Sequence, residues 1–248
     1  METIADAEKA IARNWRLAAF YIAASVAVVM AYVYCDNALD TVVPEDTRPK
    51  PLWYVAVTLL MDLGMAGTIA ALQATVFAVM GAEIDRPLWK SGGHADALRR
   101  FLGLWFIISL IYLVMVRMQG SLYAQGLESA SAALLLPRIL WTCAYIPIGV
   151  CIMHGGQLVW AEIPDRLSPI IHHFPQAAVA FGLGFLQFLV WDVTIASIPE
   201  AYHKSAVVLG IANAPLILLE CLAFAVMWHV CMAYRDTAPE REDDDFDF

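Results

Sequence analysis

Three carboxylic acids lie inside long apolar stretches of this sequence, and they are the first residues whose placement could support chemistry. Asp62, Asp192 and Glu220 are each flanked on both sides by aliphatic and aromatic residues. A charge at the centre of a membrane-crossing helix costs roughly 2.5–3.5 kcal/mol on insertion scales, so such groups seek partners or take part in ion and proton pathways. Each acid is therefore a candidate functional residue.

Two arginines and an asparagine are placed where they could meet these acids. Arg117 and Arg138 stand at the ends of successive apolar stretches, both on the expected outer side. Asn213 precedes Glu220 by seven residues, which puts the two on one face of a helix. We therefore predict one intramembrane polar cluster near the outer side, made of Asp62, Asp192, Glu220, Asn213, Arg117 and Arg138.

Such a cluster has two interpretations. As an internal ion-pair network, or as protonated carboxyls bonded to nearby carbonyls, it would hold the helices in register. As a proton- or cation-coupled pathway, it would use the carboxyls as binding groups. The apolar stretches contain few other polar residues, and a transporter of polar solutes needs a more polar lining, so the sequence favours the structural interpretation.

Histidines offer a third kind of chemistry. His154 and His229 are expected at similar depth in two parallel helices, where they could form a metal or haem site. Both stand near the ends of their apolar stretches, and histidine is common at membrane interfaces. The sequence contains no HExxH motif. We expect no metal site and no cofactor, with His154 and His229 as the weak alternative.

Composition explains what must position these groups. Of the 248 residues, 60% are hydrophobic and only 16% are charged, and the mean hydropathy is +0.64. Soluble domains carry roughly 45–50% apolar and about 25% charged residues, so the polar surface here is too small to cover a water-soluble body. The net charge of −9 and the absence of a basic patch exclude nucleic-acid binding.

The predicted fold class is therefore an all-α integral membrane protein with six transmembrane helices and a short N-terminal interfacial helix. Residues 1–14 form the amphipathic interfacial helix, residues 15–235 the six-helix transmembrane domain, and residues 236–248 an acidic disordered tail. The six spans are expected at about 17–35, 52–82, 101–116, 138–159, 177–198 and 205–234. Polar connections are expected at 36–51 and 83–100.

The distribution of lysine and arginine predicts the orientation. Ten of these 15 residues fall on the N-terminal arm, on the segments after the second and fourth spans, and at the C-terminus. Positive residues accumulate on the cytoplasmic side, which places both termini in the cytoplasm. We expect a multi-pass protein of a bacterial inner (plasma) membrane.

Two segments could recruit a protein partner. One is the loop that contains Asp85, Arg86, Pro87 and Trp89, and the other is the acidic tail ending in Phe246 and Phe248. The sequence favours a non-enzymatic scaffold or complex subunit that binds its partner through these segments. The alternative is a small proton- or cation-coupled transporter or channel that uses the intramembrane carboxylates. Expected partners are the lipid bilayer and either another protein or a second copy of the chain.

Overall fold

The computed structural model describes residues 2–43, 50–84, 93–156 and 159–237, and within these ranges it contains helices and no strands. Six helical segments are long and apolar enough to cross a membrane, which confirms the all-α prediction and its count of apolar helices. The elements are α1 (Glu2–Arg13), α2 (Trp15–Val42), α3 (Leu52–Ile84), α4 (Gly93–Ala124), α5 (Glu128–Ala133), α6 (Leu135–His154), a 3₁₀ turn (Trp160–Glu162), α7 (Ile163–Arg166), α8 (Ser168–His172), α9 (Phe174–Ser197), a second 3₁₀ turn (Glu200–Tyr202) and α10 (Ala206–Thr237).

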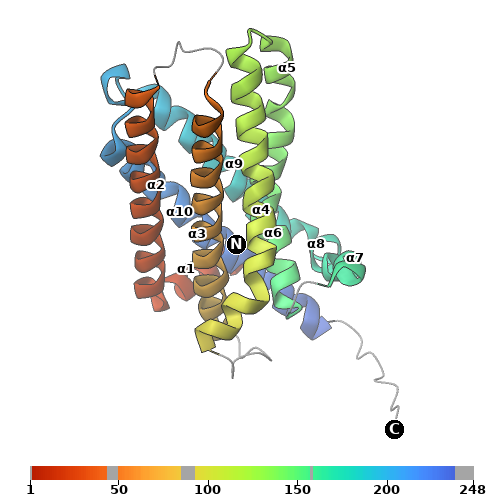
Figure 1. Cartoon of the computed structure of the whole chain (residues 1–248). Coiled ribbons are helices and arrows are strands. Elements are labelled where there is room, and N and C mark those ends of the chain that lie inside the picture. The colour runs from red at the N-terminus through yellow and green to blue at the C-terminus, as the bar shows by residue number, and fades with distance from the viewer. Residues whose placement is uncertain (1, 44–49, 85–92, 157–158, 238–248) are drawn as a thin grey trace, which may run out of the picture.

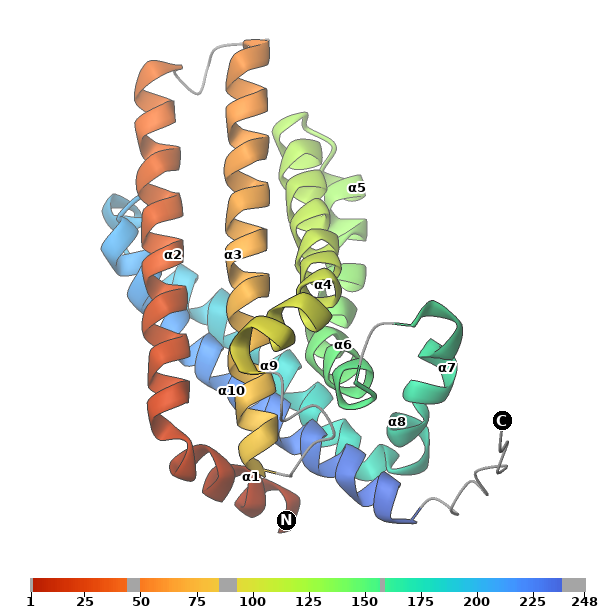
Figure 2. The same cartoon turned by 60° about the horizontal axis from the view of Figure 1, so that its bottom comes forward.

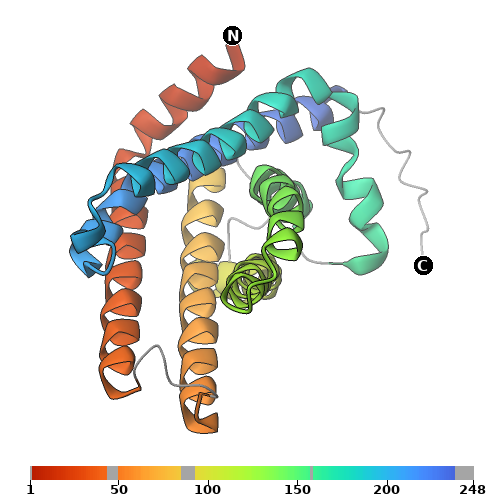
Figure 3. The same ribbon diagram turned by 90° about the horizontal axis from the view of Figure 1, so that it is seen from above.

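The long helices run up and down in alternation. Helices α2, α3 and α4 stand side by side, while α9 and α10 form a hairpin that crosses behind them at a slant (Figure 1). Seen from above, this hairpin runs along one side of the other helices (Figure 3). We call the end that holds α1 and the last turns of α10 the terminal end, and the opposite end, where α2, α4 and α9 finish, the hairpin end.

Helix α1 turns sharply away from α2 and lies across the terminal end against α10 (Figure 2). Its apolar side faces the protein: Ala7 is fully buried and Ile11 packs on the core, whereas Glu8 and Lys9 are exposed. The helix and its division into an apolar and a polar side agree with the amphipathic helix expected at residues 1–14, while its location at a membrane interface stays a prediction.

Several helices extend beyond the predicted spans. Helix α2 continues past Cys35 to Val42, and α4 begins at Gly93, although the segment before Phe101 was expected to be a loop. Hydropathy marks only the stretch that suits hydrocarbon, and a helix can continue into polar surroundings where local contacts support it. In α4 the Asp96 carboxylate pairs with Arg100 one turn later, at 2.7 Å.

Large buried side chains fill the region between the middle of the bundle and the terminal end. An aromatic cluster of Phe77, Trp105, Phe224 and Trp228 fills this region, and each member is at most 1% exposed. The Phe77 ring stacks on Phe224 with centroids 4.5 Å apart and meets Trp105 edge-on at 5.3 Å. Gly81 makes room for the Trp228 ring, because a Cβ at position 81 would lie 2.5 Å from that ring.

Candidate functional site

Glu220 lies near the middle of α10 and is bonded by side chains from three other helices. The Tyr21 hydroxyl of α2 donates to Oε2 at 2.6 Å, and the Tyr145 hydroxyl of α6 donates to Oε1 at 2.6 Å. The Gln187 amide of α9 donates to Oε1 at 3.1 Å. We call these four residues the Glu220 cluster. It joins four helices at one carboxyl group.

A close helix contact brings two members of this cluster together. Gly184 of α9 lies against the backbone of α6, and a Cβ on it would be 2.6 Å from the Thr142 carbonyl oxygen. Small residues allow this kind of backbone approach between membrane helices. Three residues further along each helix, the Tyr145 hydroxyl and the Gln187 side chain lie 3.3 Å apart. The glycine therefore sets the spacing of two groups that hold Glu220.

The Glu220 cluster contains no counter-cation among the described residues. Its donors are two phenols and an amide, and no ion pair joins Glu220 to a lysine, arginine or histidine in the described ranges. The cluster therefore carries either one proton or one uncompensated negative charge. Isolated charges are costly away from water, and neutral hydrogen bonds offset only part of that cost.

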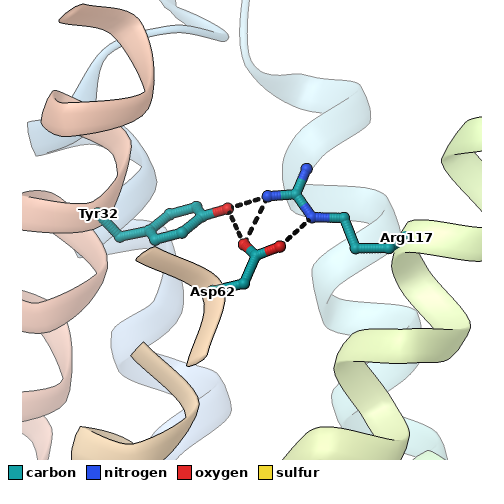
Figure 4. Close-up of polar contacts among 3 residues, drawn as sticks. All are labelled: Tyr32, Asp62 and Arg117. Atoms are coloured by element: carbon teal, nitrogen blue, oxygen red, sulfur yellow. Dashed lines mark hydrogen bonds and ion pairs between the residues drawn. The ribbon is translucent and has the colours of Figure 1, made fainter. Parts of the chain in front are cut away.

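A second polar group lies nearer the hairpin end, where Tyr32, Asp62 and Arg117 meet (Figure 4). The Arg117 guanidinium donates to both Asp62 oxygens, from Nε at 2.7 Å and from Nη2 at 2.6 Å. The Tyr32 hydroxyl donates to Oδ1 at 2.6 Å and also contacts the Arg117 Nη2. We call these three residues the Asp62 triad. It is a two-point, charge-compensated pair, the strongest arrangement for an arginine and a carboxylate.

The Asp62 triad leads to further charged groups at the hairpin end. Asp36 and Asp40 follow Tyr32 at one-turn intervals on α2. The Asp40 carboxylate lies 3.7 Å from the Lys204 ammonium and accepts a hydrogen bond from the Tyr54 hydroxyl at 3.2 Å. The Lys50 ammonium also lies here, 4.8 Å from the centre of the Tyr54 ring, so together with the triad these groups comprise three carboxylates and three cations.

The structure divides the predicted six-residue cluster. It brings Asp62 and Arg117 together but places Glu220 apart from them. Arg138 donates to the Gln119 side chain at 2.8 Å and lies over the Phe188 ring, and Asn213 donates to the Leu209 carbonyl of its own helix at 2.7 Å.

Asp192 does not join either group. Its side chain is exposed, on the same side of α9 as the exposed Leu189 and Val193. Asp192 follows the inward-facing Gln187 by five residues, which is about 140° around a helix. The prediction failed here because hydropathy places a residue along a helix axis and says nothing of its angle around it.

The two histidines make different contacts. The His154 ring lies edge-on to Trp228 at 5.0 Å, whereas His229 has a buried Nε2 without a hydrogen-bond partner in the described residues. No group of three or more His, Cys, Asp or Glu side chains that could hold a metal occurs in the described ranges. The predicted partner-binding residues lie outside those ranges: Asp85, Arg86, Pro87, Trp89, Phe246 and Phe248.

Sequence reasoning did not single out Tyr21, Tyr32, Tyr145 or Gln187 as site residues. Tyrosine in an apolar stretch is usually a packing or interface residue, so these three gave no distinctive signal. Gln187 did offer one, because it is a primary amide surrounded by apolar residues in the sequence FLQFLV. Searching for amides as well as acids inside the spans would have found it.

Comparison of this chain with protein-family models, with curated proteins and with solved structures finds no match.

Proposed function

We propose that this chain is a multi-pass protein of a bacterial inner membrane that binds and moves protons or another small cation, with Glu220 as the binding group. Both termini would lie in the cytoplasm, since the connections expected at the terminal end carry most of the lysine and arginine. Helix α1 would lie on the membrane surface with Glu8 and Lys9 toward water.

The observation that carries this proposal is the contrast between the two intramembrane carboxylates. Asp62 is compensated by a two-point contact with Arg117, as expected of a group that only holds helices together. Glu220 has no such partner among the described residues and is held by neutral donors from three helices. A group that gains and loses a cation must be stable in both states, and neutral donors allow this where a permanent arginine partner would not.

The scaffold alternative draws no support from the geometry. It depends on the loop around Pro87 and on the tail ending in Phe248, and both lie outside the described residues. The transport alternative depends on residues whose positions are described, so it is the function that we put forward.

The test is a proton-flux measurement on the full-length protein in liposomes that contain a pH-sensitive dye. A potassium diffusion potential set with valinomycin provides the driving force. We expect flux through the wild-type protein, and we expect Glu220→Gln to reduce it to the level of protein-free liposomes. Asp192→Asn is the matched control, because it also neutralises an acid in an apolar helix but lies on the exposed side of α9.

Wild-type flux no greater than that of protein-free liposomes would refute the function. Full flux through Glu220→Gln would refute the role of Glu220. Monodisperse elution of each variant in mild detergent, before reconstitution, establishes that a loss of flux is not a loss of fold.

A further inference from the structure

We infer that the species bound at Glu220 is a proton, and that it arrives from the hairpin end through water held between α2 and α3. This inference rests on the proposed function and adds the chemical identity of the substrate and its side of entry. Three features of the bundle support it: a row of polar side chains, unpaired polar atoms along that row, and an apolar seal beyond Glu220.

The row of polar side chains follows one side of α2. Tyr21, Ser25, Tyr32, Asp36 and Asp40 are spaced by four, seven, four and four residues, which keeps them on one side of the helix. Tyr21 belongs to the Glu220 cluster and Tyr32 to the Asp62 triad, so the row connects the two groups. Tyr21 and Tyr32 are eleven positions apart, which corresponds to a rise of about 16 Å along the helix axis.

Helix α3 contributes a matching row. The Tyr54 hydroxyl donates a hydrogen bond to Asp40 of α2, and the Asp62 carboxylate accepts one from Tyr32 of α2. Deeper in the bundle, Gln73 lies beside the Glu220 carboxyl. The positions between Asp62 and Gln73 on this side are Ala66 and Ala70, both buried, and their small side chains leave the polar groups of α2 in reach.

Unpaired polar atoms lie at the Glu220 end of this row: Gln73 is beside the Glu220 carboxyl, and Ser25 is one turn from Tyr21 toward the Asp62 triad. Ser25 and Gln73 are each only 2% exposed, yet the Ser25 Oγ and the Gln73 Oε1 have no hydrogen-bond partner within the described residues. Leaving such an atom unsatisfied costs about 1–3 kcal/mol. Buried water commonly satisfies atoms of this kind, and water here would bridge the interval between the two groups.

On the other side of Glu220 the aromatic cluster closes the route. The Phe77 ring meets Tyr21 edge-on at 5.3 Å and stacks on Phe224, which in turn meets Trp228 at 5.4 Å. The rings of the aromatic cluster lie between the Glu220 cluster and the terminal end, and their polar atoms, the buried indole nitrogens of Trp105 and Trp228, can donate but not accept hydrogen bonds and so cannot relay a proton. The polar row therefore approaches Glu220 from the hairpin end.

The ligands around Glu220 suit a proton better than a metal ion. Mg²⁺ and Ca²⁺ bind six or more oxygen ligands, whereas this cluster supplies one carboxylate whose oxygens already accept three hydrogen bonds. The side chains that contact Glu220 from the packed helices are Tyr21, Gln73, Tyr145 and Gln187. None of these is a fixed charge, and each tyrosine hydroxyl can both donate and accept a proton.

The hairpin end is suited to feed such a path. Asp36 and Asp40 continue the row beyond Tyr32 toward this end, and a carboxylate can accept a proton and, once protonated, donate it. The Arg117 side chain is 46% exposed while Asp62 is 4% exposed, so the Asp62 triad lies at the boundary between the exposed end and the buried row.

The first test compares proton flux through Gln73→Leu and Ser25→Val with that through Thr68→Val in the liposome assay. Thr68 is exposed and bonds to its own helix, at the Gly64 carbonyl, so its variant is the control. We expect flux to be lost in the first two variants and retained in the control. Retained flux in Gln73→Leu and Ser25→Val, with loss in Glu220→Gln, would overturn the path while leaving the proposed function intact.

The second test locates the side of entry. Ser25→Cys, with Cys35 replaced by alanine, is treated with a membrane-impermeant trimethylammonium thiosulfonate in intact spheroplasts and in inside-out vesicles, and the modified peptide is identified by mass spectrometry. We expect labelling only from the side that the hairpin end faces, and no labelling of Thr68→Cys. Labelling from the terminal side alone, or from neither side, would overturn the inference.

A third measurement needs no variant. Hydroxyl-radical footprinting of the wild-type protein oxidises side chains that lie next to water, including internal water. We expect oxidation of Tyr21 and Tyr32 and protection of Phe77 and Phe224. Protection of Tyr21 equal to that of Phe77 would refute the presence of water along the row.

Discussion

The Asp62–Arg117 pair allows a quantitative test of how charge is accommodated inside this bundle. We consider Arg117→Gln, which removes the cation but keeps a long polar side chain. The Asp62 carboxyl is 4% exposed and would keep only the Tyr32 hydroxyl of its two partners in the triad. Its charge would then be buried without compensation, and the variant should be less stable than the wild type.

The size of the effect follows from the geometry. Hydrogen bonds to a charged group contribute about 1.5–3 kcal/mol each, and two are lost. Breaking a fully buried pair costs roughly 3–5 kcal/mol, but the Arg117 side chain is 46% exposed, so water can replace part of its contact. We therefore expect a loss of about 2 kcal/mol in the free energy of unfolding.

The assay is a double-mutant cycle with Asp62→Asn, measured by reversible unfolding in mixed micelles. Because the amide introduced by Asp62→Asn is neutral and does not need a cation, Arg117→Gln should cost much less in that background, giving a coupling energy of about 1.5–2 kcal/mol. Arg138→Gln is the control, because Arg138 bonds to the neutral Gln119. A coupling energy below about 0.5 kcal/mol would refute the assignment of the pair as a compensated buried charge.

Two further predictions concern packing between the helices. Gly81→Ala should destabilise the protein, because the new Cβ would meet the Trp228 ring. Gly64→Ala should be neutral or stabilising, because no atom lies within 4 Å of the new Cβ and alanine favours helix over glycine by up to about 1 kcal/mol. Equal thermal stability of the two variants would contradict this packing. The sulfur atoms of Cys151 and Cys231 lie 3.7 Å apart, so iodine oxidation should join the two residues in a disulfide. The linked peptides would be detected by peptide mass mapping. Recovery of only unlinked peptides would show that α6 and α10 do not meet there.

The sequence by itself determined that this chain is helical and how many long apolar helices it has. Side chains that are mostly apolar leave a chain of this length without enough polar surface for water, and helices satisfy their own backbone hydrogen bonds in such surroundings. For the same reason, an acid within an apolar stretch signals a need for partners or a function. Of the residues singled out on this ground, Asp62 and Arg117 contact each other and Glu220 contacts three polar side chains, whereas Asp192 is exposed.

Only the tertiary structure decided which partner each acid has. Tyr21 and Glu220 are 199 residues apart in the chain and meet because α2 and α10 pack together. Asp192 and Gln187 lie in one apolar stretch, and the rotation of α9 turns the amide inward and the acid outward. Hydropathy is a property of position along an axis, whereas pairing depends on rotation about that axis and on the packing of neighbouring helices, which no local pattern in the sequence encodes.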